Sequence, residues 1–219
     1  MFDFFYNFQG FNQEVFLAIN QLTNHFSTIA YILQIFSYCF NLTNFALVYF
    51  VLCLYFYIQL RHIKDPTLRS SKFWIIYNNM VMIGITYTIF CITYAILKFT
   101  VNLPRPFCSL DPNIFVTIAN TSLERCLSSF PSSHTGLAIL ACYYIWPYTT
   151  TFSQKIIACM VVIIVAISRI TLAMHYPADI IYSSFIAILL IIIGRIVYKN
   201  LENNLVKWVG KVISRMINN

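Results

Sequence analysis

Residues 180–197 read IIYSSFIAILLIIIGRIV, an apolar run long enough for one crossing of a lipid bilayer. A crossing helix needs about 20 residues. Working outward from this run, we find four more of the same kind. The five predicted spans are roughly Ser37–Leu60, Phe73–Leu97, Ser133–Tyr148, Ile156–Leu172 and Ile180–Val197. The sequence therefore predicts an all-α polytopic membrane helical bundle with about five transmembrane helices.

The overall composition also indicates a membrane protein. Of the 219 residues, 59% are hydrophobic and 10% are charged, and the mean hydropathy is +0.72. A soluble domain has about 25% charged residues. The net charge of +7 does not indicate a nucleic-acid partner, because the basic residues bracket the apolar spans. We expect one membrane-embedded domain over residues 1–219, with its core at about 30–198, since a bundle of this length leaves no room for a second large domain.

The distribution of lysine and arginine predicts the orientation of the bundle. Basic residues occur between the first and second spans, between the third and fourth, and after the fifth: Arg61, Lys64, Arg69, Lys72, Lys155, Lys199, Lys207, Lys211 and Arg215. Cytoplasmic segments carry the excess of basic residues. We therefore expect the N-terminus outside and the C-terminus inside. No basic residue precedes Arg61, so a signal peptide with a positively charged start is not expected.

Both ends of the chain are predicted to form interfacial amphipathic helices. Near the N-terminus, apolar residues recur at helical spacing: Phe11, Val15, Ile19, Leu22 and Phe26. Within residues 203–218, an apolar stripe lies beside a basic ridge of Lys207, Lys211 and Arg215. This pattern fits a helix that lies on anionic lipids of the inner leaflet. Packing of the tail against the bundle is the alternative.

Almost every ionisable residue that interrupts an apolar run falls into three short stretches, which the predicted topology puts at the outer edge. The first contains Lys98 and Arg105, and Arg105 lies between Pro104 and Pro106, which end the helix. Charge inside a bilayer is costly, so such a cluster is a functional-site hypothesis. Taken alone, Lys98 could instead be an anchor whose ammonium reaches the interface.

The other two stretches suggest anion binding and nucleophilic chemistry. In residues 131–134 (PSSH), Ser132 or Ser133 can cap the following helix, whose N–H groups favour an anion. In the third stretch, Asp179 follows His175 by four residues and can accept one imidazole N–H, which leaves the other nitrogen free to attack. Taken singly, these stretches could be an ordinary capped helix and an aspartate beside a helix start.

Together the three stretches resemble the motifs of the type 2 phosphatidic acid phosphatase superfamily, the membrane lipid phosphate phosphatases. Lys98 is followed after six residues by Arg105-Pro106, and the second motif is Pro131-Ser132-Ser133-His134. The third is Ser168-Arg169, five residues, His175, three residues and Asp179. Ser133 stands where glycine is common, and this is the only departure from the pattern. The resemblance covers about residues 30–198.

The resemblance implies a role for each motif residue. His175 is expected to be the nucleophile that forms a phosphohistidine, Asp179 to orient it, and His134 to be the general acid. The remaining motif residues are expected to bind the phosphate oxygens: Lys98, Arg105, Ser132, the backbone N–H of Ser133, and Arg169. No cofactor is implied, and the sequence shows no cluster with metal-ligand spacing, so we expect a metal-independent enzyme.

The resemblance implies an integral membrane lipid phosphatase or pyrophosphatase that faces the periplasm from a bacterial inner (cytoplasmic) membrane. Undecaprenyl pyrophosphate, phosphatidylglycerol phosphate, phosphatidic acid and lipid A are the candidate substrates. A phosphotransferase that uses an acceptor other than water is the alternative. A non-catalytic scaffold is a third possibility, against which the presence of His134, His175 and Asp179 argues. No obligate protein partner is evident.

Two cysteines, Cys108 and Cys126, lie in the predicted outer loop just before the second motif. That side of the membrane is oxidising if it is a bacterial periplasm. A disulfide between them is therefore possible, and two unpaired loop thiols are the alternative.

Overall fold

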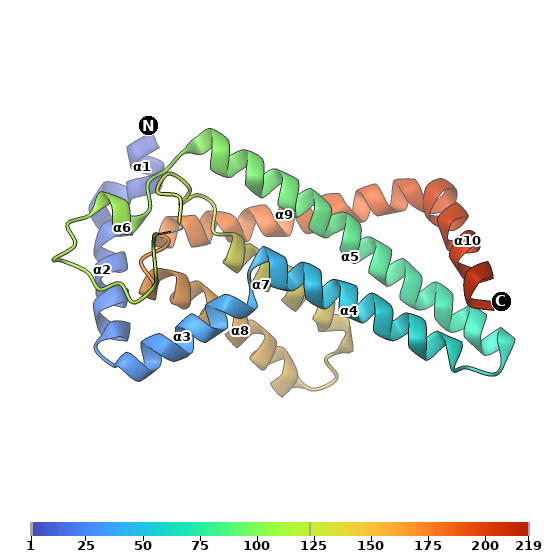
Figure 1. Cartoon of the computed structure of the whole chain (residues 1–219). Helices are drawn as coiled ribbons and strands as arrows, with labels where there is room; N and C mark the ends of the chain where they lie inside the picture. Colours follow the sequence, from blue (N-terminus) through green and yellow to red (C-terminus); the bar gives the residue numbers. More distant parts are fainter. Residues whose placement is uncertain (1, 123, 219) are drawn as a thin grey trace. The chain divides into compact units, whose positions relative to one another are not determined.

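The computed structural model describes residues 2–122 and 124–218, which form helices and no strand (Figure 1). The α-helices are α1 Phe2–Asn7, α2 Phe11–Asn24, α3 Ser27–Cys39, α4 Leu42–Arg61, α5 Pro66–Val101, α6 Pro106–Ser109, α7 Ser133–Ile145, α8 Phe152–Thr171, α9 Pro177–Leu201 and α10 Lys207–Asn218. Tighter turns occupy Phe8–Gly10 and Trp146–Tyr148, and a wider helical segment occupies Glu202–Val206. The predicted all-α membrane helical bundle is confirmed.

Within the described residues, four helical stretches are long and apolar enough to cross a membrane. They are Leu42–Arg61, Pro66–Ser109, Phe152–Thr171 and Pro177–Ile217, and they correspond to four of the five predicted spans. The remaining predicted span is α7, which has 13 residues. At 1.5 Å per residue it is about 20 Å long, shorter than the roughly 30 Å hydrocarbon core. Pro147 lies in the turn that follows α7, where it prevents the helix from continuing.

The first predicted span starts too early, because the chain breaks between α3 and α4. The side chain of Asn41 accepts the backbone N–H of Asn44 at 2.7 Å, which caps the start of α4. The Asn44 amide in turn donates to the carbonyl of Tyr38 at 2.6 Å, near the end of α3. These two side chains satisfy backbone groups that a continuous helix would have paired internally. Residues 37–39 therefore belong to α3.

The chain divides into two compact units. One consists of Met1–Asn44 and Ile92–Ile188, and the other of Phe45–Cys91 and Leu189–Asn219. In the first unit, α8 packs against α2, α3 and α7. A buried hydrophobic cluster includes residues of the loop between α8 and α9; its members are Phe16, Phe115, Ile170, Ala173 and Tyr176. Every motif residue predicted from the sequence lies in this first unit.

Helix α2 buries a polar face. Asn12, Phe16 and Asn20 are buried, whereas Phe11 and Leu22 of the predicted apolar stripe are 62% and 69% exposed. The hydrogen bonds of Asn20 explain why this face is buried. Its side chain accepts the N–H of Val116 at 2.8 Å and donates to the carbonyl of Thr171 at 3.0 Å. The side-chain amide of Asn20 thus attaches α2 to the rest of the first unit. Ile19 of the predicted stripe packs against the buried hydrophobic cluster, so only part of the stripe faces outward, and its interfacial position stays a prediction.

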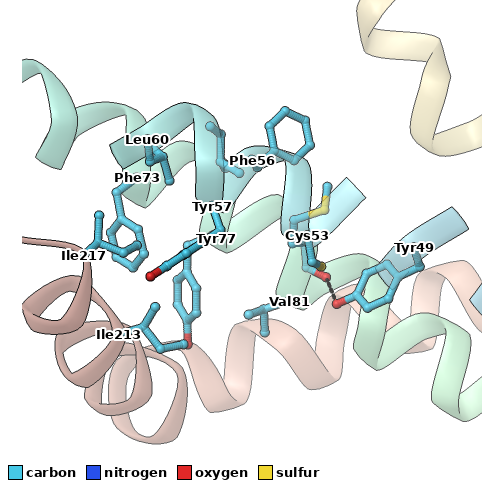
Figure 2. Close-up of a pocket in the computed structure, with 12 residues that line it drawn as sticks. Tyr49, Cys53, Phe56, Tyr57, Leu60, Phe73, Tyr77, Val81, Ile213 and Ile217 are labelled. Carbon is cyan, nitrogen blue, oxygen red and sulfur yellow. Dashed lines mark hydrogen bonds between the residues drawn. The ribbon is translucent and has the colours of Figure 1, made fainter. Parts of the chain in front are cut away.

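The second unit holds α4, the first part of α5, the last part of α9, and α10. Leu60, Phe73 and Ile217 form its buried cluster, so one face of α10 packs inward. The opposite face leaves Trp208 and Met216 exposed. Figure 2 shows an apolar pocket in this unit, lined by residues that include Tyr49, Cys53, Phe73, Tyr77 and Ile213. The tail therefore has both the inward packing of the alternative interpretation and an outward face with apolar and basic residues.

Candidate active site

The predicted motif residues lie on segments that backbone hydrogen bonds connect. The N–H of Arg105 donates to the carbonyl of Cys126 at 2.9 Å, and the N–H of Ser129 donates to Leu103 at 3.0 Å. The N–H of His175 donates to the carbonyl of Arg169 at 3.3 Å. Further along, the N–H of Ser132 lies 3.4 Å from the carbonyl of Asp179. These contacts connect the ends of α5 and α8 with the starts of α7 and α9.

Three cations come together at the ends of these helices. Lys98 donates from Nζ to the carbonyl of Ser128 at 2.9 Å. Arg105 and Arg169 are 6% and 5% exposed. Arg169 donates from Nη1 to the hydroxyl of Ser37 at 2.5 Å. The Nε atoms of both arginines are buried and have no hydrogen-bond partner among the residues that the structure describes.

These two unpartnered donors are suited to bind an anion. Buried polar groups in native proteins are nearly always hydrogen-bonded, and an unsatisfied charged donor carries a large desolvation cost. A guanidinium presents its donors in a fork that matches phosphate and carboxylate oxygens. Arg105 and Arg169 can therefore hold an anion between them through donors that no protein group occupies in the described residues.

The His175 imidazole is 1% exposed and lies in the loop between α8 and α9. Its pKa is well below the ordinary value, mainly because burial disfavours the charged form and also because Arg169 and Lys98 repel it. The neutral imidazole has one nitrogen free of a proton. His175 is thus held in the protonation state that a nucleophile requires.

The Asp179 carboxylate lies close to His175 but is bonded chiefly to other groups. The distance from Asp179 Oδ2 to His175 Nδ1 is 3.6 Å, longer than a hydrogen bond. The same Oδ2 atom accepts the N–H of Tyr176 at 2.8 Å and the hydroxyl of Ser129 at 2.5 Å. Oδ1 accepts the hydroxyl of Tyr6 at 2.7 Å. The carboxylate is fully buried, and these three donors fix its orientation.

The start of α7 carries the second motif. Ser132 occupies the N-cap position, but its side chain makes no capping hydrogen bond. Its hydroxyl instead lies 3.0 Å from the hydroxyl of Thr135, so the predicted side-chain cap by Ser132 is not formed. Ser133 is the first residue of α7, and His134 follows it. The Nδ1 atom of His134 is buried and has no partner within the described ranges.

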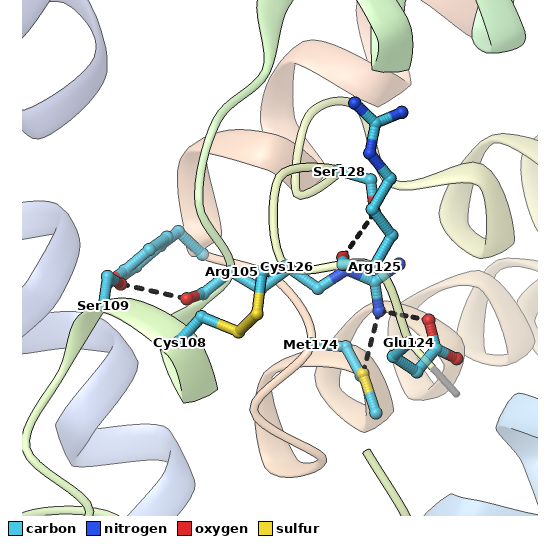
Figure 3. The surroundings of a disulfide bond; sticks show 9 residues. Arg105, Cys108, Ser109, Glu124, Arg125, Cys126, Ser128 and Met174 are labelled. Carbon is cyan, nitrogen blue, oxygen red and sulfur yellow. Dashed lines mark hydrogen bonds and ion pairs between the residues drawn. A yellow bond between two sulfur atoms is a disulfide. The ribbon is translucent and has the colours of Figure 1, made fainter. Parts of the chain in front are cut away.

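A disulfide joins Cys108, on α6, to Cys126, in the loop before α7, with 5.8 Å between the Cα atoms (Figure 3). Both cysteines border Arg105, since the N–H of Cys108 donates to the Arg105 carbonyl at 3.0 Å. In Figure 3 the Arg105 side chain lies between Met174 and Glu124. Its Nη1 atom is 2.6 Å from the Glu124 carboxylate. The disulfide thus lies next to one of the proposed anion ligands.

Three residues of this region were not predicted from the sequence. Ser129 lies two residues before the second motif, and its position there is a weak signal. Tyr6 and Glu124 lie outside every motif, and nothing in their local sequence links them to Asp179 or Arg105. Within residues 2–122 and 124–218, no group of three or more His, Cys, Asp or Glu side chains is placed to hold a metal ion.

Comparisons with known proteins agree with this architecture. The crystal structure of LpxE from Aquifex aeolicus superposes with a TM-score of 0.60, at 18% sequence identity, over 84% of this chain and 94% of that one. This likeness shows a shared fold. A search of curated proteins finds no match. The family model of the PAP2 superfamily matches residues 76–203, which is more than half of the chain and includes all three motifs. The chain therefore belongs to the PAP2 superfamily.

Proposed function

We propose that this membrane protein is a lipid phosphatase, which removes a phosphate monoester or pyrophosphate group from a membrane lipid through a phosphohistidine at His175. The observation that carries the proposal is the pair of buried, unpartnered Nε–H groups of Arg105 and Arg169 near the neutral His175 imidazole. A phosphate group supplies the oxygens that these donors lack. Family membership supports the same chemistry.

Binding of the phosphate is assigned to the cations and to the start of α7. Lys98, Arg105 and Arg169 neutralise the charge of the equatorial oxygens, which is the main requirement in phosphoryl transfer. The N-terminus of α7 adds the partial positive charge of its helix dipole at Ser132 and Ser133. Because these groups are buried, their interactions with the phosphate are stronger than they would be in water.

In the first step, His175 attacks the phosphorus atom through Nε2. The bond from Nε2 to phosphorus forms and the bond from phosphorus to the leaving oxygen breaks, while His134 gives its proton to that oxygen. The negative charge of the bound phosphate favours the imidazolium form of His134. Asp179 stabilises the positive charge that develops on His175, whose Nδ1 atom lies 3.6 Å from Oδ2.

In the second step, water attacks the phosphohistidine. His134, now neutral, takes a proton from the water as the bond from Nε2 to phosphorus breaks, and inorganic phosphate leaves. An acceptor alcohol in place of water would make the protein a phosphotransferase. Release of inorganic phosphate, against formation of a new phosphate ester, separates the two outcomes.

A lipid substrate fits the surroundings of this cluster. The spanning helices of the first unit leave apolar side chains exposed, Ile163 on α8 and Ile181 and Phe185 on α9 among them. We propose that these surfaces face the hydrocarbon of a bacterial inner membrane. From the positive-inside rule, the site faces the periplasm, the N-terminus is outside and the C-terminus inside. Termini on opposite sides need an odd number of crossings, so this orientation requires the short helix α7 to cross as the fifth span together with the residues that flank it. The basic face of α10 would then bind anionic lipids of the inner leaflet.

Phosphate release by purified protein tests the proposal. The substrates are undecaprenyl pyrophosphate, phosphatidylglycerol phosphate, phosphatidic acid and lipid A, with glucose 6-phosphate as the soluble comparison. We expect kcat/KM to be much higher for at least one lipid, since each buried CH₂ contributes about 0.8 kcal/mol. The His175→Ala variant should release no phosphate, and His62→Ala, outside the motifs, should behave as wild type. Equal efficiency on the soluble ester would contradict the lipid assignment.

A chelator and sealed vesicles test the remaining parts of the proposal. Activity should be the same with and without a chelator, and a loss that a divalent cation restores would contradict metal independence. Right-side-out membrane vesicles should hydrolyse lipid phosphate added from outside. Activity that appears only after the vesicles are opened would contradict the periplasmic orientation.

A further inference from the structure

Two hydroxyl groups from outside the three motifs converge on the Asp179 carboxylate. The Tyr6 hydroxyl, on α1, donates to Oδ1 at 2.7 Å, and the Ser129 hydroxyl donates to Oδ2 at 2.5 Å. Tyr6 is 173 residues from Asp179 in the sequence, and Ser129 is 50 residues away. Because the carboxylate is fully buried, it depends on protein donors in place of water.

The direction of these hydrogen bonds follows from the chemistry of the groups. Burial and the charge of Asp179 raise the pKa of Tyr6 above its ordinary value, so the phenol keeps its proton and is the donor. An ionised carboxylate only accepts hydrogen bonds, and donors that point at it stabilise the ionised form. Together with the N–H of Tyr176, the two hydroxyls supply one donor to Oδ1 and two to Oδ2.

Three donors on two oxygens determine the plane of the carboxylate. They hold Oδ2 at 3.6 Å from Nδ1 of His175. Catalytic hydrogen bonds are often long without substrate and shorten in the reacting complex. A carboxylate that is already clamped can pair with the developing imidazolium without first losing rotational freedom, which is the advantage of preorganisation.

We propose that Tyr6 and Ser129 are positioning residues, whose hydroxyls hold the Asp179 carboxylate in the orientation that aims the His175 imidazole at phosphorus. This inference rests on the proposed role of His175 as the nucleophile. It assigns a function to α1, which lies outside the matched family region at residues 76–203.

A purely structural role of Tyr6 is the competing explanation, and the chain offers a matched control for it. The ring of Tyr6 packs edge-on against Tyr176, with 6.3 Å between the ring centroids. A second hydroxyl also fastens α1 to α9, because Tyr182 donates to the carbonyl of Phe5 at 2.6 Å. Tyr182→Phe removes an attachment of α1 without removing a donor to Asp179.

The kinetic experiment uses purified full-length protein and dioleoyl phosphatidic acid. Tyr6→Phe and Ser129→Ala should each lower kcat on the order of 10–100-fold, the scale for partners that orient a functional imidazole. KM should stay within about threefold, since neither hydroxyl is assigned to phosphate binding. Ser129→Thr keeps the hydroxyl and should recover most of the rate. Tyr182→Phe should retain wild-type kcat, and an equal loss in Tyr182→Phe would overturn the proposal.

A double-variant comparison separates positioning through Asp179 from a general effect on the fold. In an Asp179→Ala background, Tyr6→Phe should cause no further loss of kcat, because its partner is already absent. The same fold loss in both backgrounds would show that Tyr6 does not act through Asp179, and would overturn the inference.

Binding of orthovanadate gives a measurement that does not depend on turnover of a lipid. Vanadate adopts the five-coordinate geometry of the transferring phosphoryl group. Its affinity therefore reports how well the His175 imidazole is oriented for attack. Thermal-shift titration should show weaker vanadate binding in Tyr6→Phe and Ser129→Ala, and unchanged binding in Tyr182→Phe. If wild-type protein binds vanadate but hydrolyses none of the lipids, the proposed function fails while the vanadate comparison still decides the role of Tyr6. Unchanged vanadate affinity and unchanged kcat in both Tyr6→Phe and Ser129→Ala would overturn the inference that these two residues position Asp179.

Discussion

The guanidinium of Arg105 and the carboxylate of Glu124 form an ion pair, with 2.6 Å between Nη1 and Oε2. The Arg105 side chain is 7% exposed, whereas that of Glu124 is 39% exposed and comes from the loop before α7. A carboxylate and a phosphate offer similar oxygen acceptors to a guanidinium. Glu124 therefore occupies a donor of a cation that we assign to phosphate binding, and we expect it to compete with the substrate.

Replacement of Glu124 tests this competition. In Glu124→Gln the negative charge is removed, so Arg105 should be more available and KM should fall roughly 2–5-fold. That factor corresponds to about 0.5–1 kcal/mol, the range for a partly exposed ion pair. Steady-state kinetics on a lipid phosphate provide the measurement, with Glu14→Gln on the exposed side of α2 as the control. A higher KM would show instead that Glu124 holds Arg105 in place for the substrate.

The assignment of His175 and Asp179 predicts two different losses of activity. His175→Ala should abolish turnover with the fold retained, because no other group in the proposed mechanism forms the covalent intermediate. Asp179→Asn should lose roughly 10²–10⁴ in rate, the range for a disturbed acid–base partner. Phosphate release, together with the midpoint of thermal unfolding, checks both variants. Near-wild-type activity in His175→Ala would rule out the phosphohistidine.

The role of His134 predicts selective rescue by a good leaving group. An aryl phosphate with an acidic phenol needs little protonation as its oxygen departs, so it should restore much of the lost rate in His134→Ala. The same substrate should not rescue His175→Ala, which lacks the nucleophile. Comparison of the two variants on aryl and alkyl phosphates measures this difference. Equal rescue would mean that the acid and the nucleophile are wrongly assigned.

The lowered pKa of His175 predicts a pH-dependent stability. Burial is the main cause of the shift, so the folded state resists protonation that the unfolded state accepts near the ordinary value of about 6.5. The unfolded state then binds more protons, and stability falls as the pH drops below that value. The loss of stability from this group therefore grows as the pH falls further below about 6.5.

The His175→Gln variant isolates this contribution, because glutamine does not titrate. Thermal unfolding of wild type and variant in detergent, at pH 7 and pH 5, gives the comparison. Wild type should lose more stability than His175→Gln on acidification. The same loss in both proteins would show that His175 has an ordinary pKa in the folded state.

The motifs could be located from the sequence because each one lies at a helix end within a contiguous stretch. The spacing from Lys98 to Arg105 and from Arg169 to Asp179 is local, and prolines mark the helix boundaries. The helical bundle was predictable for a similar reason, since apolar runs of spanning length leave few other folds. Local patterns therefore predicted which segments bear the candidate site.

Features that depend on distant partners could not be predicted in the same way. Asn20 is buried because it pairs with Val116 and Thr171, which are 96 and 151 residues away. The helical periodicity of residues 11–26 carries no information about where these distant partners lie. The break at Asn41 was missed because the apolar composition continues on both sides of it.

The disulfide between Cys108 and Cys126 leaves five cysteines free to react. Thiol labelling of denatured, non-reduced protein should modify five of the seven cysteines, namely Cys39, Cys53, Cys91, Cys142 and Cys159. Modification of all seven would rule out the bond.

Closure of a loop of this length, with a sequence separation of 18, contributes on the order of 3 kcal/mol by restricting the unfolded chain. Cys108→Ser with Cys126→Ser should therefore lower the midpoint of thermal unfolding. The Arg105 N–H donates to the Cys126 carbonyl, so the double variant should also raise KM more than it lowers kcat. A lower midpoint with unchanged KM would show that the bond stabilises the fold without supporting Arg105.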